Sequence, residues 1–170
     1  VPHRFQALTP VPQKTAHSII AKSFKMHAQR SDLHRFSMDN LTPIQLKELS
    51  MERLADAKAL YTAGRCDGAF YICGYAIEMT LKYKICKTLD WDEYIVSGKG
   101  SENHKSFKTH KFDDLLRYSG AEKHKNTLFL AEWSIVMKWE SEIRYSSAKQ
   151  STEDVKLMIK ATESILEKLL

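Results

Sequence analysis

The spacing of apolar positions in the first half of the folded part predicts two helices in succession. From about residue 43 to 63, leucine, isoleucine and alanine recur at helical intervals with polar residues between them. Thr42-Pro43 suits the start of such a helix and Gly64 suits its end. The next segment, Cys66 to Thr88, is apolar around most of its circumference in its first three turns, which is typical of a helix at the centre of a bundle.

The second half of the chain continues the helical pattern after an irregular stretch from Leu89 to Thr109. We expect a short helix at Lys111 to Tyr118, a long helix from Glu122 to about Ile143, and a last helix opened by Ser151 or Thr152. No segment alternates apolar and polar residues convincingly enough to predict a strand. The sequence therefore predicts an all-α, up-and-down bundle of four long helices plus a short one.

The charge is concentrated at the start of the chain. The 170 residues include 26 Lys and Arg against 21 Asp and Glu, a formal net charge of +5. Residues 1–37 account for all of this excess, and residues 38–170 are neutral overall. We therefore expect a basic N-terminal arm at 1–37 and a folded domain at 38–170. The arm has three interpretations: a weakly ordered extension, an arm for nucleic acid or an anionic surface, or an organelle-targeting peptide.

Several classes of protein are disfavoured by what the sequence contains. Gly68 to Ile77, the longest charge-free stretch in the domain, has about half of the roughly 20 residues needed to cross a membrane. Cys66, Cys73 and Cys86 lie too far apart along one predicted helix to form a disulfide, which fits a reducing compartment. No paired cysteine or histidine motif suggests zinc. We expect a soluble, cytoplasmic protein without a metal or cofactor.

Arg65 to Lys82 ends in Ala-Ile-Glu-Met-Thr-Leu-Lys. This segment looks like the second helix of the HEPN family (higher eukaryote and prokaryote nucleotide-binding domains), and two later segments resemble the same family in order. Thr109 to Leu116 resembles its histidine-led short helix, and Glu142 to Tyr145 resembles the arginine-containing end of its penultimate long helix. The resemblance covers about residues 50–170 and implies a HEPN-like helical bundle.

The resemblance also implies a function, with one departure from the family pattern. Many HEPN proteins are dimeric, metal-independent ribonucleases in which four to six residues separate an arginine from the histidine that follows it. After Arg144 the chain reads Tyr145 to Ser151 without a histidine. Arg117 and His124 have the right spacing, but they flank the predicted break at Ser119-Gly120. The resemblance therefore implies a degenerate or non-catalytic member that forms a homodimer, with a toxin-antitoxin or defence context as one possibility.

The candidate ligand-binding residues fall into three groups. Arg144, with Tyr145 beside it, can bind a phosphate through paired guanidinium donors, or can form an ion pair with Glu140 or a neighbouring glutamate. Glu78 and Lys82 are four residues apart on the apolar helix, so that this pair either fixes helix register or lines a cleft.

The third group is a basic stretch in the irregular connection. Lys105, Lys108 and Lys111, with Lys99 before them, can contact RNA or nucleotide phosphates, or can be solvated parts of a flexible loop. His110 can cap the following helix, move a proton or simply pack.

Three functions remain open on the sequence alone. The favoured one is a dimeric module that binds nucleotide or RNA phosphates without turnover. The second is a ribonuclease in which His110 moves the proton of the 2'-hydroxyl and Arg144 stabilises the charge on phosphorus. The third is a scaffold that docks another protein and has no nucleic-acid ligand.

Overall fold

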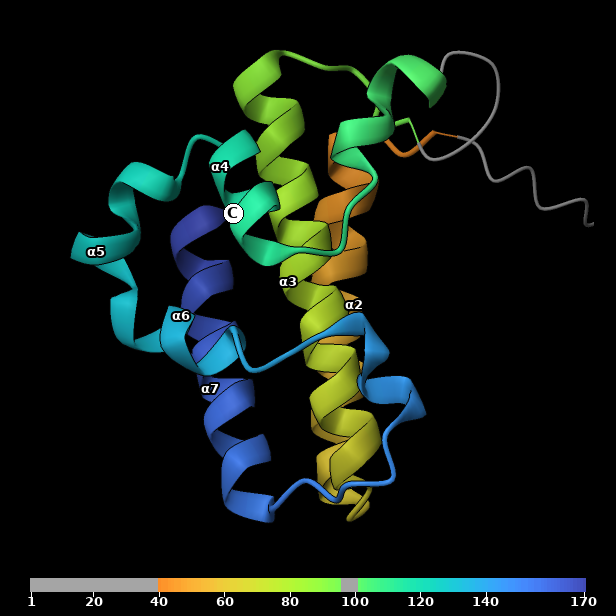
Figure 1. Ribbon diagram of the computed structural model, residues 1–170, viewed down its shortest axis with the longest axis vertical. Helices are drawn as coiled ribbons and strands as arrows, with labels where there is room; N and C mark the ends of the chain where they lie inside the picture. The colour runs from red at the N-terminus through yellow and green to blue at the C-terminus, as the bar shows by residue number, and fades with distance from the viewer. Residues whose placement is uncertain (1–39, 96–100) are drawn as a thin grey trace, which may run out of the picture. The chain divides into compact units, whose positions relative to one another are not determined.

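The computed structural model describes residues 40–95 and 101–170. Within these ranges the backbone is helical apart from loops and one isolated antiparallel bridge between Leu41 and Tyr94, so the predicted all-α fold is confirmed (Figure 1). The basic arm predicted at residues 1–37 and the candidate Lys99 lie outside the described residues.

Two long helices, α2 (Pro43–Thr62) and α3 (Cys66–Leu89), form an antiparallel pair close to the predicted boundaries. Thr42 caps α2 through a capping box, in which its hydroxyl accepts from the Gln45 amide and the Gln45 side chain accepts from the Thr42 amide. The turn between the helices contains Gly64 at a φ of 71°, a left-handed conformation that favours glycine. Thr42 therefore caps the start of α2 and Gly64 follows its end, as the sequence predicted.

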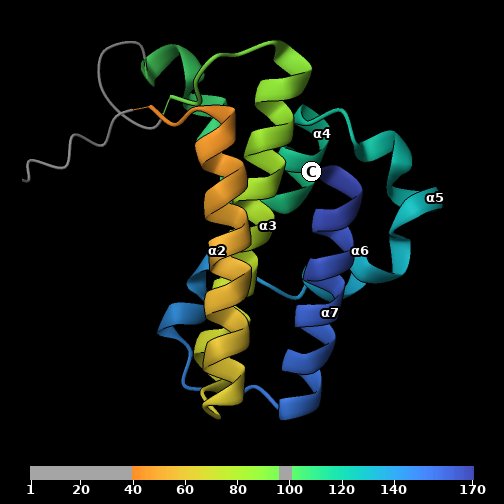
Figure 2. The same ribbon diagram turned by 180° about the vertical axis from the view of Figure 1, so that it is seen from behind.

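The third long helix, α7 (Thr152–Leu169), packs lengthwise on α3 and begins after Ser151, whose hydroxyl accepts from the Asp154 amide. Figures 1 and 2 show α2, α3 and α7 side by side along the long axis of this domain. Eleven residues of α3 are buried, from Ala69 to Cys86. Helix α3 is therefore the central helix of the bundle, as its apolar composition predicted.

The long helix predicted from Glu122 to about Ile143 is wrong. The structure has four short pieces there: the 3₁₀ turn η2 (Glu122–His124), α5 (Lys125–Leu128), α6 (Leu130–Val136) and the 3₁₀ helix η3 (Ser141–Tyr145). Helix α6 ends at Val136, and Trp139 is buried just beyond it. Trp139 packs on α3, where its Nε1 donates to the Tyr71 carbonyl at 2.9 Å.

The irregular stretch after α3 is anchored by aromatic contacts. It contains the 3₁₀ helix η1 (Ser101–Phe107) and leads into the short helix α4 (Phe112–Tyr118), which packs on α3. The ring of Trp91 lies 4.9 Å from that of Phe107, and Phe107 lies 4.8 Å from the ring of Tyr118. These contacts fix the segment that carries His110. In the described part of the chain, no helix has the length and apolar character required to span a bilayer.

Candidate functional site

Four polar side chains follow one face of α3. Tyr71, Tyr75, Glu78 and Lys82 are separated by four, three and four residues, so they lie in one row along the helix. We call this row the α3 polar stripe. The 3₁₀ helix η3 packs near its first end, and the segment before α4 crosses its middle. Two segments that are far apart in the sequence therefore bring their side chains to the same face of α3.

Glu78 is the buried centre of the stripe, with a side chain only 2% exposed. Its Oε1 lies 2.6 Å from Lys82 Nζ, and its Oε2 lies 2.8 Å from His110 Nδ1. The predicted Glu78–Lys82 pair is therefore present. A buried carboxylate needs such partners, because removing it from water is costly.

His110 is placed by the extended segment that precedes α4. Its side chain is 52% exposed, although its Nδ1 contacts the buried carboxylate of Glu78. A carboxylate only accepts hydrogen bonds, so Nδ1 carries the proton and Nε2 is the atom directed to other partners. Nε2 has no hydrogen-bond partner in residues 40–95 and 101–170. The imidazole is thus oriented at one nitrogen and available to a ligand at the other.

Arg144, on η3, is held by aromatic residues. Its Nη1 lies 3.5 Å from the Tyr71 hydroxyl, and its guanidinium carbon lies 4.8 Å from the centre of the Tyr145 ring. Hydrogen bonds to Tyr71 and then Tyr145 raise the pKa of Arg144. No carboxylate of the described residues lies within 4.0 Å of this guanidinium, so the ion pair with Glu140 is not found there.

Tyr71 and Tyr75 are site residues that the sequence reasoning missed. Their hydroxyl oxygens lie 2.8 Å apart, and their rings meet edge to face. Desolvation opposes ionisation of Tyr71, but hydrogen bonds with Arg144 and Tyr75 outweigh it and lower its pKa; desolvation raises the pKa of Tyr75 to about 12. Their helical spacing with Glu78 was visible in the sequence and could have indicated a polar row.

The carboxylate of Glu142 lies within electrostatic reach of both Arg144 and His110. Its pKa is lowered first by the hydrogen bond from the Ser141 hydroxyl, and also by the charges of Arg144 and His110. The two cations are therefore on the same side of the domain. Their anchoring residues, Tyr71 and Glu78, are however seven residues apart on α3, or about 10 Å along the helix axis.

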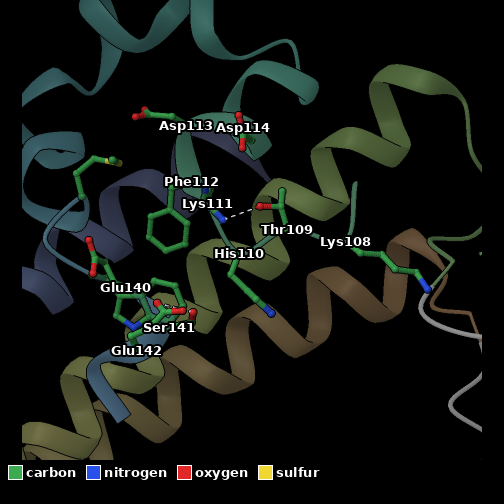
Figure 3. A pocket seen from close by; sticks show the side chains of 12 residues that line it. Lys108, Thr109, His110, Lys111, Phe112, Asp113, Asp114, Glu140, Ser141 and Glu142 are labelled. Carbon is green, nitrogen blue, oxygen red and sulfur yellow. Dashed lines mark hydrogen bonds between the residues drawn. The ribbon is translucent and has the colours of Figure 1, made fainter. Parts of the chain in front are cut away.

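A groove with a volume of about 760 Å³ lies beside this row. Figure 3 shows Phe112 in its middle, with Glu140 and Glu142 on one side and Lys108 and His110 on the other. Four carboxylates line it, against two lysines and one histidine. This acidic excess makes the groove as a whole a poor site for a polyanion.

The structure separates the three described lysines of the basic stretch. Lys108 lines the large groove and a smaller cavity, Lys111 lines only the groove, and Lys105 lines neither. Arg117 and His124, which have the family's spacing, do not form a joint site either. Arg117 pairs with Asp114 at 2.6 Å, and His124 is an exposed residue of η2. Lys108 is thus the lysine best placed to act with His110.

No cluster of three or more His, Cys, Asp or Glu side chains that could hold a metal ion occurs in the described ranges. Comparison with protein-family models, with curated proteins and with solved structures finds no match for this chain. The HEPN resemblance therefore stays a prediction that rests on the three sequence segments.

Proposed function

We propose that this protein binds single-stranded RNA through its phosphates along the α3 polar stripe, without cleaving it. The observation that carries the proposal is the setting of Arg144, whose guanidinium is held by Tyr71 and Tyr145 and has no carboxylate partner among the described residues. The aromatic contacts orient this cation, and it has no direct ion pair in the described part of the chain. A guanidinium in this setting suits a phosphate, to which it can offer two parallel donors.

The length of the stripe favours an oligonucleotide over a single phosphate. Tyr71, which holds Arg144, and Lys82 are eleven residues apart on α3, a distance of about 16 Å along the axis. His110 is held between them by Glu78. Groups spread over this distance can contact more than one phosphate of a single strand, and phosphate contacts supply most of the affinity in non-specific nucleic-acid binding.

Two features favour binding over cleavage. No histidine follows Arg144 between Tyr145 and Ser151, so the motif of the family that this chain resembles is incomplete. In addition, Tyr71 and Glu78, which contact Arg144 and His110, are about 10 Å apart along α3, whereas two groups that act on one phosphate must converge on it. Together with the HEPN resemblance, these features support a degenerate HEPN-type domain. The homodimer and the toxin-antitoxin context belong to the same proposal.

The test is a titration of a fluorescently labelled eight-nucleotide RNA, followed by anisotropy at several salt concentrations. Arg144→Gln and Lys108→Gln are each expected to weaken binding about tenfold, the effect of losing one charged hydrogen bond. Each should also reduce the salt dependence by about 0.7 in the slope of log K against log salt. Lys160→Gln, which removes an exposed lysine of α7, is the matched control. Equal binding by all four proteins would refute the proposal.

A metal-independent ribonuclease is the second candidate, and the Glu78–His110 pair is the observation that favours it. A carboxylate that orients an imidazole at one nitrogen leaves the other to take the proton of a 2'-hydroxyl. Arg144 would stabilise the charge that develops on the phosphate oxygens. Incubation of the protein with mixed RNA in EDTA tests this candidate. Cleavage that disappears in both His110→Ala and Arg144→Gln would establish it, and intact RNA would exclude it.

A further inference from the structure

A second, smaller cavity opens beside Lys82 and His110, at the far end of the stripe from Arg144. Its volume is about 210 Å³, below the roughly 300 to 1,000 Å³ of pockets for drug-sized ligands. It is therefore large enough for one ring system but not for a whole nucleotide. Its lining consists of Leu41, Leu46, Met79, Lys82, Tyr94, Lys108 and His110.

The walls of this cavity are apolar and are held by backbone contacts. Leu46 is fully buried and Tyr94 is 3% exposed. Leu41 and Tyr94 bond to each other through both backbone groups, at 3.0 and 2.7 Å, and the Tyr94 hydroxyl donates to the Phe107 carbonyl. The hydroxyl of Tyr94 is therefore occupied, so its ring serves as an apolar wall in a cavity formed before any ligand arrives.

Two lysines supply hydrogen-bond donors to the same cavity. The Lys82 ammonium lies 5.1 Å from the centre of the Tyr94 ring and uses one of its three N–H groups on Glu78. Lys108 has no carboxylate within 4.0 Å in the described part of the chain. An ammonium group donates and never accepts, so a ligand here must present acceptor atoms to Lys82 and Lys108.

We propose that this cavity binds the uracil base of an RNA whose phosphates lie along the α3 polar stripe, an inference that rests on the proposed function. A flat pyrimidine ring suits the small apolar cavity, and the cations beside it suit the phosphate attached to the same nucleotide. Uracil presents a carbonyl oxygen at position 4, where cytosine presents an amino group that donates. Uracil has two ring carbonyl oxygens, at positions 2 and 4, that can accept from the two lysines, whereas the second acceptor of cytosine is its ring nitrogen N3; donors on either side of the ring therefore match uracil better.

The test compares three RNA strands of equal length and charge: oligouridine, oligocytidine and an oligomer without bases. Uridine is expected to bind at least tenfold more tightly than the abasic strand, which is within the range of one base contact, and more tightly than cytidine. If uridine and abasic strands bind equally well, the base site is refuted and the phosphate proposal stands. If none of the strands binds, the proposed function itself fails. Equal affinity for uridine and cytidine would overturn the assignment of uracil.

A variant that fills the cavity separates this site from the phosphate contacts. Met79→Phe should reduce the affinity for oligouridine to that of the abasic strand and leave abasic binding unchanged. Met51→Phe is the matched control, because Met51 is an exposed methionine of α2. Circular dichroism establishes that each variant folds, and Leu41→Phe replaces Met79→Phe if the latter does not. Unchanged discrimination in a folded cavity-filling variant would overturn the proposal.

Discussion

The indole ring of Trp139 lies directly against the backbone of Gly74 on α3. A Cβ atom built on Gly74 would come within 2.0 Å of Trp139 Cε2, which is far shorter than any van der Waals contact. The indole is also stacked on Phe112, with ring centres 4.9 Å apart and planes 4° from parallel. Gly74 is therefore the position on α3 that admits Trp139, and Trp139 in turn places η3 and Arg144.

Gly74→Ala is expected to destabilise the domain by about 1 to 3 kcal/mol, because the added methyl group would overlap with the indole of Trp139. Urea denaturation measures the change. Gly68→Ala is the matched control on the same helix, since its Cβ would lie 3.5 Å from Leu60 Cδ1, an ordinary contact. That variant should be neutral or more stable by up to about 1 kcal/mol, owing to the helix propensity of alanine. Similar losses in both variants would contradict this account.

The long helices could be predicted from sequence because their signals are local. A capping threonine before proline, a glycine stop and apolar residues at helical spacing placed α2 and α3 within one or two residues of their observed ends. The segment from Glu122 to Ile143 has the same kind of pattern but a different structure. The contact of Trp139 with Gly74, 65 positions away in the sequence, is a tertiary interaction that no local pattern reports.

For the site too, local contacts could be predicted from the sequence and long-range contacts could not. The Glu78–Lys82 pair follows from its i, i+4 spacing on a helix, and it is present. The addition of His110 to the same carboxylate depends on how the segment before α4 crosses α3, 32 residues away in sequence. The contact between Arg144 and Tyr71 spans 73 residues and depends on the break after Val136. Long-range packing therefore decided which candidates meet.

Glu78→Leu is expected to destabilise the domain by about 3 to 5 kcal/mol, because it leaves the Lys82 ammonium, whose side chain is only 12% exposed, without its partner. The double variant Glu78→Leu/Lys82→Met should recover most of this loss, since it removes both charges. Thermal or urea unfolding of Glu78→Leu, Lys82→Met and the double variant gives the coupling free energy between the two side chains. Additive effects would show that the two groups do not interact.

The stability of the domain should depend on Glu132 at low pH. Lys168 at 2.8 Å and Ser164 at 2.7 Å donate to its Oε1, and these hydrogen bonds, the one from Lys168 first, lower the pKa of Glu132 from 4.5 to about 2. A carboxyl with a lowered folded-state pKa stabilises the fold above its unfolded pKa. That contribution, about 1 to 2 kcal/mol after solvent screening, is lost as the pH falls from 4.5 toward 2.

Glu132→Gln tests this dependence, because a glutamine does not titrate. The difference in unfolding free energy between the original protein and Glu132→Gln should be constant above about pH 5 and should shrink as the pH falls toward 2. Glu167→Gln, on the exposed face of α7, serves as the control. A difference that stays the same from pH 6 to pH 3 would show that the contact of α6 with α7 does not depend on this charge.

Arg144→Gln should raise the pKa of Tyr71. Burial of Tyr71 works in the opposite direction to the hydrogen bond from Arg144, and that hydrogen bond contributes to the net lowering of its pKa. Without the guanidinium, less opposes the effect of desolvation on Tyr71, so its phenol should ionise at higher pH.

Carbon-13 NMR of labelled tyrosine measures the titration, and Tyr71→Phe identifies the signal. Arg117→Gln is the control, because Arg117 lies over Tyr118 instead, 5.6 Å from its ring centre. If the pKa of Tyr71 is the same in Arg144→Gln, the guanidinium is not held on the stripe, and the phosphate proposal loses the observation that carries it.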